Sequence, residues 1–230
     1  MAIEATRPLA LVTGAADGIG AEVARLLAEE GHAVIVAERD EAAARALADA
    51  LVAEGHDAEA IALDTADPDS VAVLVDAIGF RPLSVLVITA ARCADRPETA
   101  AAADLDRARE VMSTHLFGAW RLVQAVLPAL ARSGSARIVN VGSEPGAPGD
   151  PGLGLPAGAA SAGHAVSQAA LHALTGMLAA ELRTAGVLVN AVDPGPAAPA
   201  DGAQRVVDAA LLPADGPTGT FTRDGRRLPR

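Results

Sequence analysis

A histidine and a glutamine lie four residues apart in the stretch SAGHAVSQAALHAL, residues 161–174. Four residues make about one helical turn, so a helix here would project His164 and Gln168 from one face toward one site. Imidazole can move a proton near neutral pH, and an amide both donates and accepts hydrogen bonds. The 230 residues include no tyrosine and no lysine, so acid–base chemistry must use other groups. We therefore predict that His164 and Gln168 belong to a catalytic site.

Glycines follow the first apolar run at a spacing that suits phosphate binding. The segment TGAADGIG, residues 13–20, joins the strand-like run LALVTG to a helical stretch. Such glycines permit a tight turn and close backbone approach, and the start of the helix offers N–H groups and a positive dipole end to a pyrophosphate. A plain turn between a strand and a helix is the alternative. We predict a dinucleotide site that includes Thr13, Gly14, Asp17, Gly18, Ile19 and Gly20.

The end of the second strand-like run indicates which dinucleotide binds. Glu38 stands 18 residues beyond Gly20, where a carboxylate can accept hydrogen bonds from the ribose hydroxyls of NAD. Arg39 follows and could instead pair with the 2′-phosphate of NADP. Asp17, inside the glycine loop, would repel that phosphate. We predict that NAD(H) is favoured over NADP(H).

Apolar runs alternate with Ala/Leu-rich helical stretches along the whole chain. This alternation predicts repeated strand–helix units and one domain over residues 1–230, with a doubly wound parallel sheet of about seven strands and helices on both faces. The expected strands are 9–14, 33–38, 58–64, 84–90, 136–142 and 187–193. The expected helices are 19–30, 41–54, 68–78, 104–132 and 162–185, with loops at 142–163 and 193–203.

The composition of the chain limits the classes of partner that the protein can bind. The net charge of −11 repels nucleic acid and anionic lipid, and only 2% of the residues are aromatic, which leaves little surface for stacking on bases. No apolar run approaches the roughly 20 residues that span a bilayer, and the first residues lack the pattern of a signal peptide. We expect a cytoplasmic protein with a small-molecule substrate, without a nucleic-acid or membrane partner and without a metal.

Nearly the whole chain resembles the short-chain dehydrogenase/reductase family. The family's glycine motif TGxxxGxG is matched at residues 13–20, and HLFGAWRLVQAVLPAL, ARIVNVGS, QAALHALTGMLAAEL and VLVNAVDPG follow in the family's order. The ending LLPADGPTGTFTRDGRRLP is similar to the family's last strand. The resemblance implies a Rossmann-type fold, NAD(P)(H) binding and oxidoreductase chemistry. It extends the implied cofactor contacts to Asp64, Thr65, Ala90, Gln168, Pro194 and Gly195.

The family's catalytic pattern is only partly present. Its serine corresponds to Ser143, its Tyr-xxx-Lys pair falls on His164 and Gln168, and its helix asparagine falls on His115. In the family the lysine lowers the pKa of the tyrosine, a task that an uncharged amide cannot perform. Imidazole needs no such help, so His164 could exchange the proton, with Ser143 orienting the substrate and His115 relaying protons. Pro199 stands where relatives carry a threonine that binds the nicotinamide amide.

Two classes of function remain open. One is an enzyme with a Ser/His/Gln site that acts on a small carbonyl or alcohol, or that has turned to a non-redox dehydration, isomerisation or cyclisation. The other is a catalytically silent protein that senses a dinucleotide or acts as a scaffold. The helices at 104–132 and 162–185 resemble the family's four-helix interface, which implies a homodimer or homotetramer.

Five further residues receive ordinary structural assignments. We expect His32, His56 and His172 to be solvent or interface residues on helix ends or in helical runs, and Trp120 to be a packing residue. Cys93, the single cysteine, lies just after the fourth expected strand, and a single thiol without an argument for a lowered pKa is not expected to be a nucleophile.

Overall fold

Seven parallel strands and one short antiparallel strand form a single sheet. The computed structural model describes residues 7–89, 98–142, 161–195, 199–223 and 225–227. Across the sheet the strand order is β3-β2-β1-β4-β5-β6-β7-β8, and only β8 runs antiparallel to its neighbour. The strands are β1 (Leu9–Thr13), β2 (Ala33–Glu38), β3 (Ala58–Ala62), β4 (Leu83–Thr89), β5 (Ala136–Val141), β6 (Val187–Asp193), β7 (Phe221–Arg223) and β8 (Arg226–Arg227).

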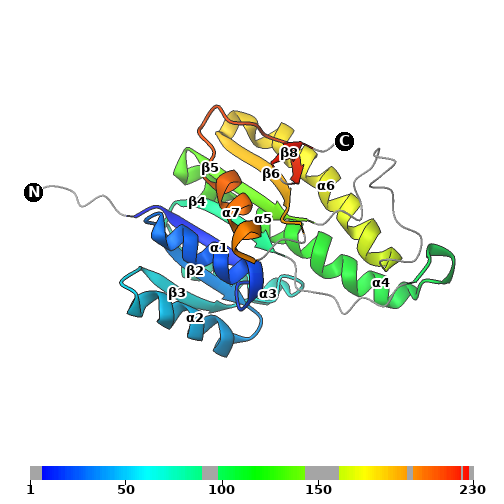
Figure 1. Ribbon diagram of the computed structural model, residues 1–230, viewed down its shortest axis with the longest axis horizontal. Helices are drawn as coiled ribbons and strands as arrows, with labels where there is room; N and C mark the ends of the chain where they lie inside the picture. The colour runs from blue at the N-terminus through cyan, green and yellow to red at the C-terminus, as the bar shows by residue number, and fades with distance from the viewer. Residues whose placement is uncertain (1–6, 90–97, 143–160, 196–198, 224, 228–230) are drawn as a thin grey trace, which may run out of the picture.

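The strand order reverses beside β1. From β1 the chain moves outward to β2 and β3, then returns to place β4 on the other side of β1 (Figure 1). The crossovers that leave β1 and β4 therefore diverge, and a crevice opens outside the carboxyl ends of these two strands. This edge of the sheet positions the candidate site.

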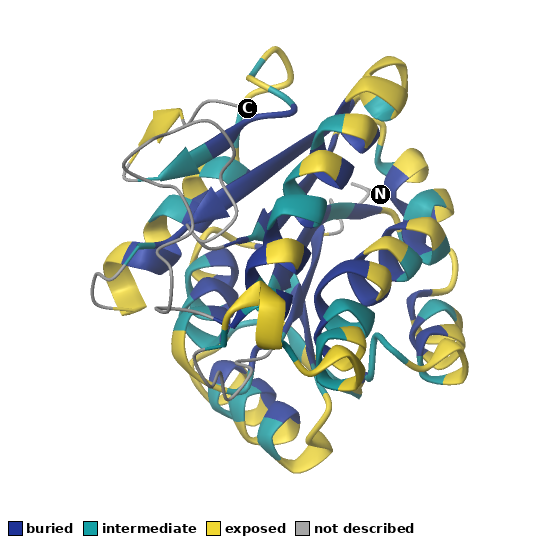
Figure 2. Cartoon of the chain, turned by 90° about the vertical axis from the view of Figure 1, so that its right-hand side faces the viewer, coloured by how far each residue is buried: buried dark blue, intermediate teal, exposed yellow. Residues whose placement is uncertain are grey.

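Helices cover both faces of the sheet. Buried side chains of α1 (Gly18–Glu29), α2 (Glu41–Ala53) and α7 (Pro199–Ala210) pack on one face. Those of α3 (Pro68–Ile78), α5 (Ala119–Ser133) and α6 (Ala162–Leu182) pack on the other. Figure 2 shows dark strands at the centre and helices with exposed outer sides. The predicted α/β Rossmann-type fold is confirmed, with eight strands because a turn after β7 adds β8.

The helix expected over residues 104–132 is interrupted. It divides into α4 (Leu105–Met112), a π-helical turn (Ser113–Gly118) and α5. Glycine at 118 permits a close approach, since a Cβ there would lie 2.5 Å from Oγ1 of Thr65 in the loop after β3. Arg121 fastens the same loop, because its Nη1 donates to the carbonyl of Thr65 at 2.7 Å. Single-turn π-bulges occur often at functional sites, and this one carries His115.

The prediction that residues 193–203 form a loop is wrong in its second half. Helix α7 begins at Pro199, with Asp201 in its first turn. Both residues are typical of helix starts, and the buried residues Ala203, Val206, Val207 and Ala210 repeat at helical spacing. The helix start lies inside a Pro/Gly-rich segment, which is why the whole of residues 193–203 was expected to be a loop. The sequence nevertheless carries the signals of this helix.

One of the ordinary assignments is also corrected. His32 is buried, 7% exposed, because the chain turns directly from α1 into β2 there. Trp120 of α5 is 36% exposed. His56 and His172 are half-buried, and Cys93 lies outside the described residues.

Candidate active site

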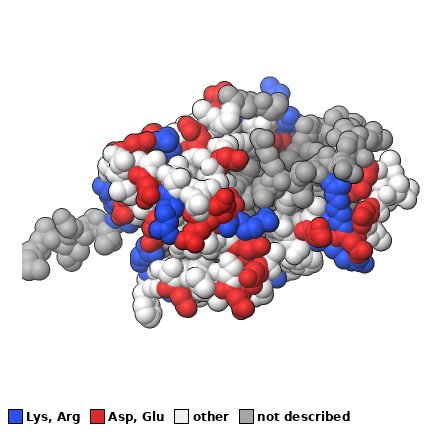
Figure 3. Space-filling view, turned by 90° about the horizontal axis from the view of Figure 1, so that it is seen from below, with Lys and Arg blue, Asp and Glu red and all other residues white. Residues whose placement is uncertain are grey.

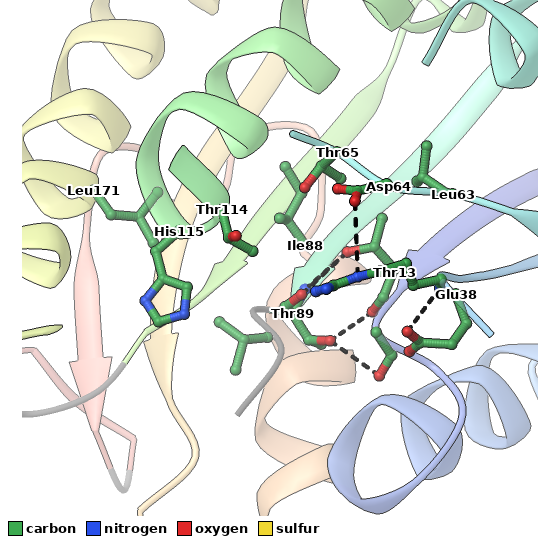
Figure 4. A pocket seen from close by; sticks show the side chains of 13 residues that line it. Thr13, Glu38, Leu63, Asp64, Thr65, Ile88, Thr89, Thr114, His115 and Leu171 are labelled. Atoms are coloured by element: carbon green, nitrogen blue, oxygen red, sulfur yellow. Dashed lines mark hydrogen bonds and ion pairs between the residues drawn. The ribbon is translucent and has the colours of Figure 1, made fainter. Parts of the chain in front are cut away.

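A cleft runs along the carboxyl edge of the sheet and gathers residues from four strands, the loops that follow them and the loop after β3, and two helical segments. Figure 4 shows two ends, an acidic end with Glu38 and Asp64 and a histidine end with His115, separated by the ends of β1 and β4. The lining residues are Thr13, Gly14, Glu38, Arg39, Leu63, Asp64, Thr65, Ile88, Thr89, Thr114, His115, Val141 and Leu171. The predicted adenosine-side residues and His115 therefore share one cleft.

The glycine turn needs its glycines for close approach. Gly14 has φ of +59°, and a Cβ there would collide with Oγ1 of Thr89. A Cβ on Gly20 would collide with the carbonyl oxygen of Gly14 and lie 2.8 Å from its carbonyl carbon. The start of α1 can thus pack directly on the turn, which brings its first N–H groups to the cleft.

The start of α1 suits a phosphate. Gly18 has φ of +55°, and a Cβ there would meet nothing within 4 Å, so space remains beside the helix start. Asp17, the N-cap residue, makes no side-chain cap hydrogen bond, whereas Asp40 accepts from Ala42 and Ala43 at the start of α2. Ile19 is half-buried beside it. This cradle fits the pyrophosphate of a dinucleotide, with backbone N–H groups as donors.

A pair of threonines fixes the glycine turn to β4. Thr89 Oγ1 donates to the carbonyl of Thr13 at 2.5 Å and to that of Gly14 at 3.2 Å. Thr89 N–H donates to Thr13 Oγ1 at 3.2 Å. Sequence reasoning missed Thr89, although a threonine at the carboxyl end of an expected buried strand was a usable signal.

The acidic end of the cleft holds a network of charges. Glu38 Oε1 accepts the backbone N–H of Arg39 at 2.7 Å, which folds the carboxylate back over the end of β2. The Nε of Arg39 lies 4.0 Å from Oδ2 of Asp64, so the guanidinium faces an acidic neighbour. Asp64 Oδ1 also accepts the N–H of Ala66 at 2.9 Å. Two carboxylates and one arginine therefore line the place where the sequence predicts the adenosine.

The histidine end is built from the π-helical turn and the first turns of α6. The rings of His115 and His164 meet edge to face, with centroids 5.3 Å apart and planes at 88°. Nδ1 of His115 lies 3.3 Å from Oγ of Ser167, and that hydroxyl donates to the carbonyl of His164 at 2.7 Å. Ser161 caps α6, since its Oγ accepts from the N–H of His164 at 3.2 Å. Sequence reasoning paired His164 with Gln168 and missed Ser167.

Gln168 lies in the same helix as His164 and beside the end of β5. It is 2% exposed, and a Cβ on Gly142, at the end of β5, would lie 3.4 Å from its Oε1 and 2.8 Å from Nε2 of His172. The ring of His172 in turn stacks on Phe221 of β7, with centroids 3.8 Å apart. The glutamine thus packs beside Gly142 and His172, whereas His164 meets His115.

The end of β6 carries the remaining predicted contacts. The buried Asp193 accepts the N–H of Gly195 at 2.8 Å, and its Oδ2 lies 3.8 Å from Nε of Arg223. Pro194 is buried and accepts a hydrogen bond from Arg205 at 2.6 Å. Arginines from β7 and α7 therefore fix the turn that contains Pro194 and Gly195.

Two predicted site residues, Ser143 and Ala90, lie outside the described residues. In the described part of the chain, no three His, Cys, Asp or Glu residues are grouped so that they could hold a metal ion. No helix there is long and apolar enough to cross a bilayer.

On the face in Figure 3, acidic side chains and arginines are interspersed, as on an ordinary solvated surface.

Comparison with known proteins agrees with this geometry. The chain is 39% identical over 192 residues to cis-4-hydroxycyclohexanecarboxylate dehydrogenase of Sinomonas cyclohexanicum, which covers 81% of this chain and 72% of that protein. It is 35% identical over 194 residues to the 3-oxoacyl-[acyl-carrier-protein] reductase FabG of Staphylococcus aureus. The aligned residues cover 81% of this chain and 73% of that protein. A metagenomic short-chain oxidoreductase solved in complex with NADP superposes with a TM-score of 0.81 at 28% identity. The superposition covers 94% of this chain and 96% of that structure.

The family model for short chain dehydrogenases matches residues 8–209. This range runs from the start of β1 to α7 and contains the glycine turn, the acidic end of the cleft, His115 and His164. The family binds NAD(P) dinucleotides, and the named relatives are oxidoreductases. The chain belongs to the short chain dehydrogenase family.

Proposed function

We propose that this protein is an NAD(H)-dependent oxidoreductase that interconverts a small carbonyl compound and its alcohol through a histidine site. The observation that carries the proposal is that His115 lines one end of the cleft and that the ring of His164 meets it, with centroids 5.3 Å apart. Both are imidazoles, which exchange protons near neutral pH without an activating cation. The absence of tyrosine and lysine from the sequence leaves this pair as the available proton carriers of the site.

Each residue has a defined task in this proposal. The turn at Gly14 and the start of α1 hold the pyrophosphate, and Glu38 accepts hydrogen bonds from the ribose. When bound, the dinucleotide donates or accepts the hydride. His164 donates a proton to the carbonyl oxygen, or accepts one from the alcohol, and passes it to His115. Ser143 orients the substrate oxygen.

The acidic end of the cleft supports NAD(H) over NADP(H). Glu38 would repel a 2′-phosphate, and Arg39, the nearby cation, already faces Asp64. We expect Glu38→Gln to raise the affinity for NADPH relative to NADH by about tenfold, because it removes one negative charge at nearly constant shape. Calorimetric titration with both coenzymes measures this ratio, and tighter binding of NADPH than NADH by the wild type would refute the preference.

A specific observation favours a second candidate, a dinucleotide-binding protein without turnover. Gln168 stands where the family's lysine does, carries no charge, and is buried beside Gly142 and His172. An uncharged amide would hold the nicotinamide ribose by hydrogen bonds alone, without the charge that a lysine supplies. A non-redox dehydration, isomerisation or cyclisation at the same histidines is the third possibility. These candidates share the predicted binding of the dinucleotide and differ in turnover.

Variants of two histidines separate the candidates. We expect His164→Ala to abolish turnover, monitored as nicotinamide absorbance across a panel of carbonyls and alcohols, while NADH still binds in calorimetry. His56→Ala is the matched control, because His56 precedes β3 and lies at the opposite edge of the sheet. Full activity in His164→Ala would refute the proposed role. Binding without turnover across the panel in the wild type would instead support the silent protein.

We also propose that the protein forms a homodimer or homotetramer. Phe117 is 50% exposed and Trp120 is 36% exposed one helical turn further on, and Leu105 of α4 and Val166 of α6 are 65% and 52% exposed. Exposed apolar side chains grouped on neighbouring helices are typical of an interface. Sedimentation should give two or four times the 23.0 kDa mass of the chain, and Phe117→Asp should reduce it. Phe80→Asp is the control, since Phe80 follows α3 and is 92% exposed. A monomeric wild type contradicts the proposal.

A further inference from the structure

The hydroxyl of Ser167 fixes the position of a proton in the histidine pair. Its Oγ donates to the backbone carbonyl of His164 at 2.7 Å, a short bond of good strength within α6. A serine hydroxyl has one hydrogen and two lone pairs. Because the hydrogen is committed to the carbonyl, Ser167 presents lone pairs to its second neighbour.

That second neighbour is Nδ1 of His115, 3.3 Å from the same oxygen. An imidazole nitrogen that faces an acceptor must carry a hydrogen to form a bond. The opposite arrangement would take the hydroxyl hydrogen away from the carbonyl at 2.7 Å to serve a partner at 3.3 Å, and Ser167 would then make one of these two hydrogen bonds in place of both. We infer that Ser167 holds neutral His115 in the Nδ1–H tautomer, so that Nε2 carries the lone pair.

Burial strengthens this selection. Ser167 is 0% exposed and His115 is 3% exposed, so water does not compete freely for either group. Buried hydrogen bonds gain strength from the low local dielectric, and a buried donor without its acceptor is costly. The hydrogen-bond partner on one nitrogen of a histidine sets which nitrogen is protonated, and here that partner is a serine on another helix.

The tautomer has a chemical consequence for the site. With Nδ1 occupied by hydrogen, neutral His115 acts as a proton acceptor through Nε2. It can receive a proton from a protonated His164, whose ring it contacts, and it cannot supply one until it has itself been protonated. Ser167 is thus a positioning residue that prepares His115 to take up the proton released when an alcohol is oxidised. This direction rests on the proposed function, whereas the tautomer itself does not.

Nuclear magnetic resonance tests the tautomer directly. Long-range ¹H–¹⁵N correlation on protein labelled with ¹⁵N-histidine, at about pH 8 where imidazole is largely neutral, distinguishes protonated from bare ring nitrogens. His115→Asn identifies the His115 signals by their loss. We expect wild-type His115 to show a protonated Nδ1 and a bare Nε2. In Ser167→Ala the ratio of Nδ1–H to Nε2–H forms should fall at least about fivefold, because the acceptor is gone.

Thr175→Val is the matched control. Thr175 is also a buried α6 hydroxyl that donates to a helix carbonyl, at 2.8 Å to Leu171, and its other partner is Asn140. Its loss should leave the His115 tautomer unchanged. A protonated Nε2 in the wild type overturns the inference without any variant, and so does an unchanged Nδ1–H form in folded Ser167→Ala. If Ser167→Ala shifts the His115 tautomer but the wild type shows no turnover, the inference about Ser167 stands and only the proposed enzyme activity is refuted.

Discussion

Substituting alanine for Gly20 has two opposite effects on stability, a gain in helix propensity and a loss from steric contact. Gly20 lies in the first turn of α1, and by propensity alone glycine to alanine inside a helix stabilises by up to about 1 kcal/mol. Its new Cβ, however, would collide with the carbonyl oxygen of Gly14 and lie 2.8 Å from the carbonyl carbon of Gly14 and 3.0 Å from Cα of Ala15. All three are backbone atoms of the turn, so no side chain can rotate to relieve the contact.

The expected cost exceeds the gain. Overpacking costs about 1–3 kcal/mol, and contacts with backbone atoms that cannot rotate away put this one at the upper end, about 2–3 kcal/mol. After a helical gain of about 1 kcal/mol we expect a net destabilisation of about 1–2 kcal/mol. For a chain of this length that lowers Tm by roughly 2–8 °C. Displacement of the turn should also weaken NADH binding at least about tenfold, equivalent to about 1.4 kcal/mol.

Gly176→Ala provides the control with the opposite sign. Gly176 also lies inside a helix, α6, but a Cβ there would meet nothing within 4 Å. Propensity should act alone and raise Tm by roughly 1–4 °C. Thermal denaturation followed by circular dichroism, at one protein concentration for all three proteins, measures both shifts. A Gly20→Ala variant as stable as the wild type would refute the steric argument for the turn.

Three further substitutions test other contacts. Thr89→Val removes the hydroxyl bonded to Thr13 and Gly14, and should cost about 1–3 kcal/mol in denaturant unfolding; an unchanged midpoint would mean that these bonds add nothing. Asp40→Ala removes the cap of α2 and should cost about 1 kcal/mol, read from the same transition. Burial lowers the pKa of His32, so the unfolded chain takes up the proton first and stability falls as the pH drops below about 6.5. His32→Asn should flatten the plot of unfolding free energy against pH below about pH 6.5. An unaltered slope would contradict a lowered pKa of His32.

The sequence by itself determined the sheet and the phosphate cradle. Continuous apolar runs suit strands that are covered on both faces, and the six strands expected from them match β1 to β6 to within two residues at either end. The glycines at 14, 18 and 20 serve a purely local need, a turn and a close approach between a strand and the next helix. Signals of this kind are carried by neighbouring residues, so they can be read without the fold. Helix α7 was readable in the same way.

Only the tertiary structure decided which side chains meet. Spacing predicts that His164 and Gln168 share one helix face. Only the structure shows their neighbours, which are His115 of the π-helical turn for His164, and Gly142 and His172 for Gln168. The π-helical turn that carries His115 ends at Gly118, which lies close to Thr65 of a loop remote in sequence. The direction and partner of a side chain are set by packing between elements, which helical spacing does not encode. The histidine pair and its serine therefore emerge from three-dimensional contact.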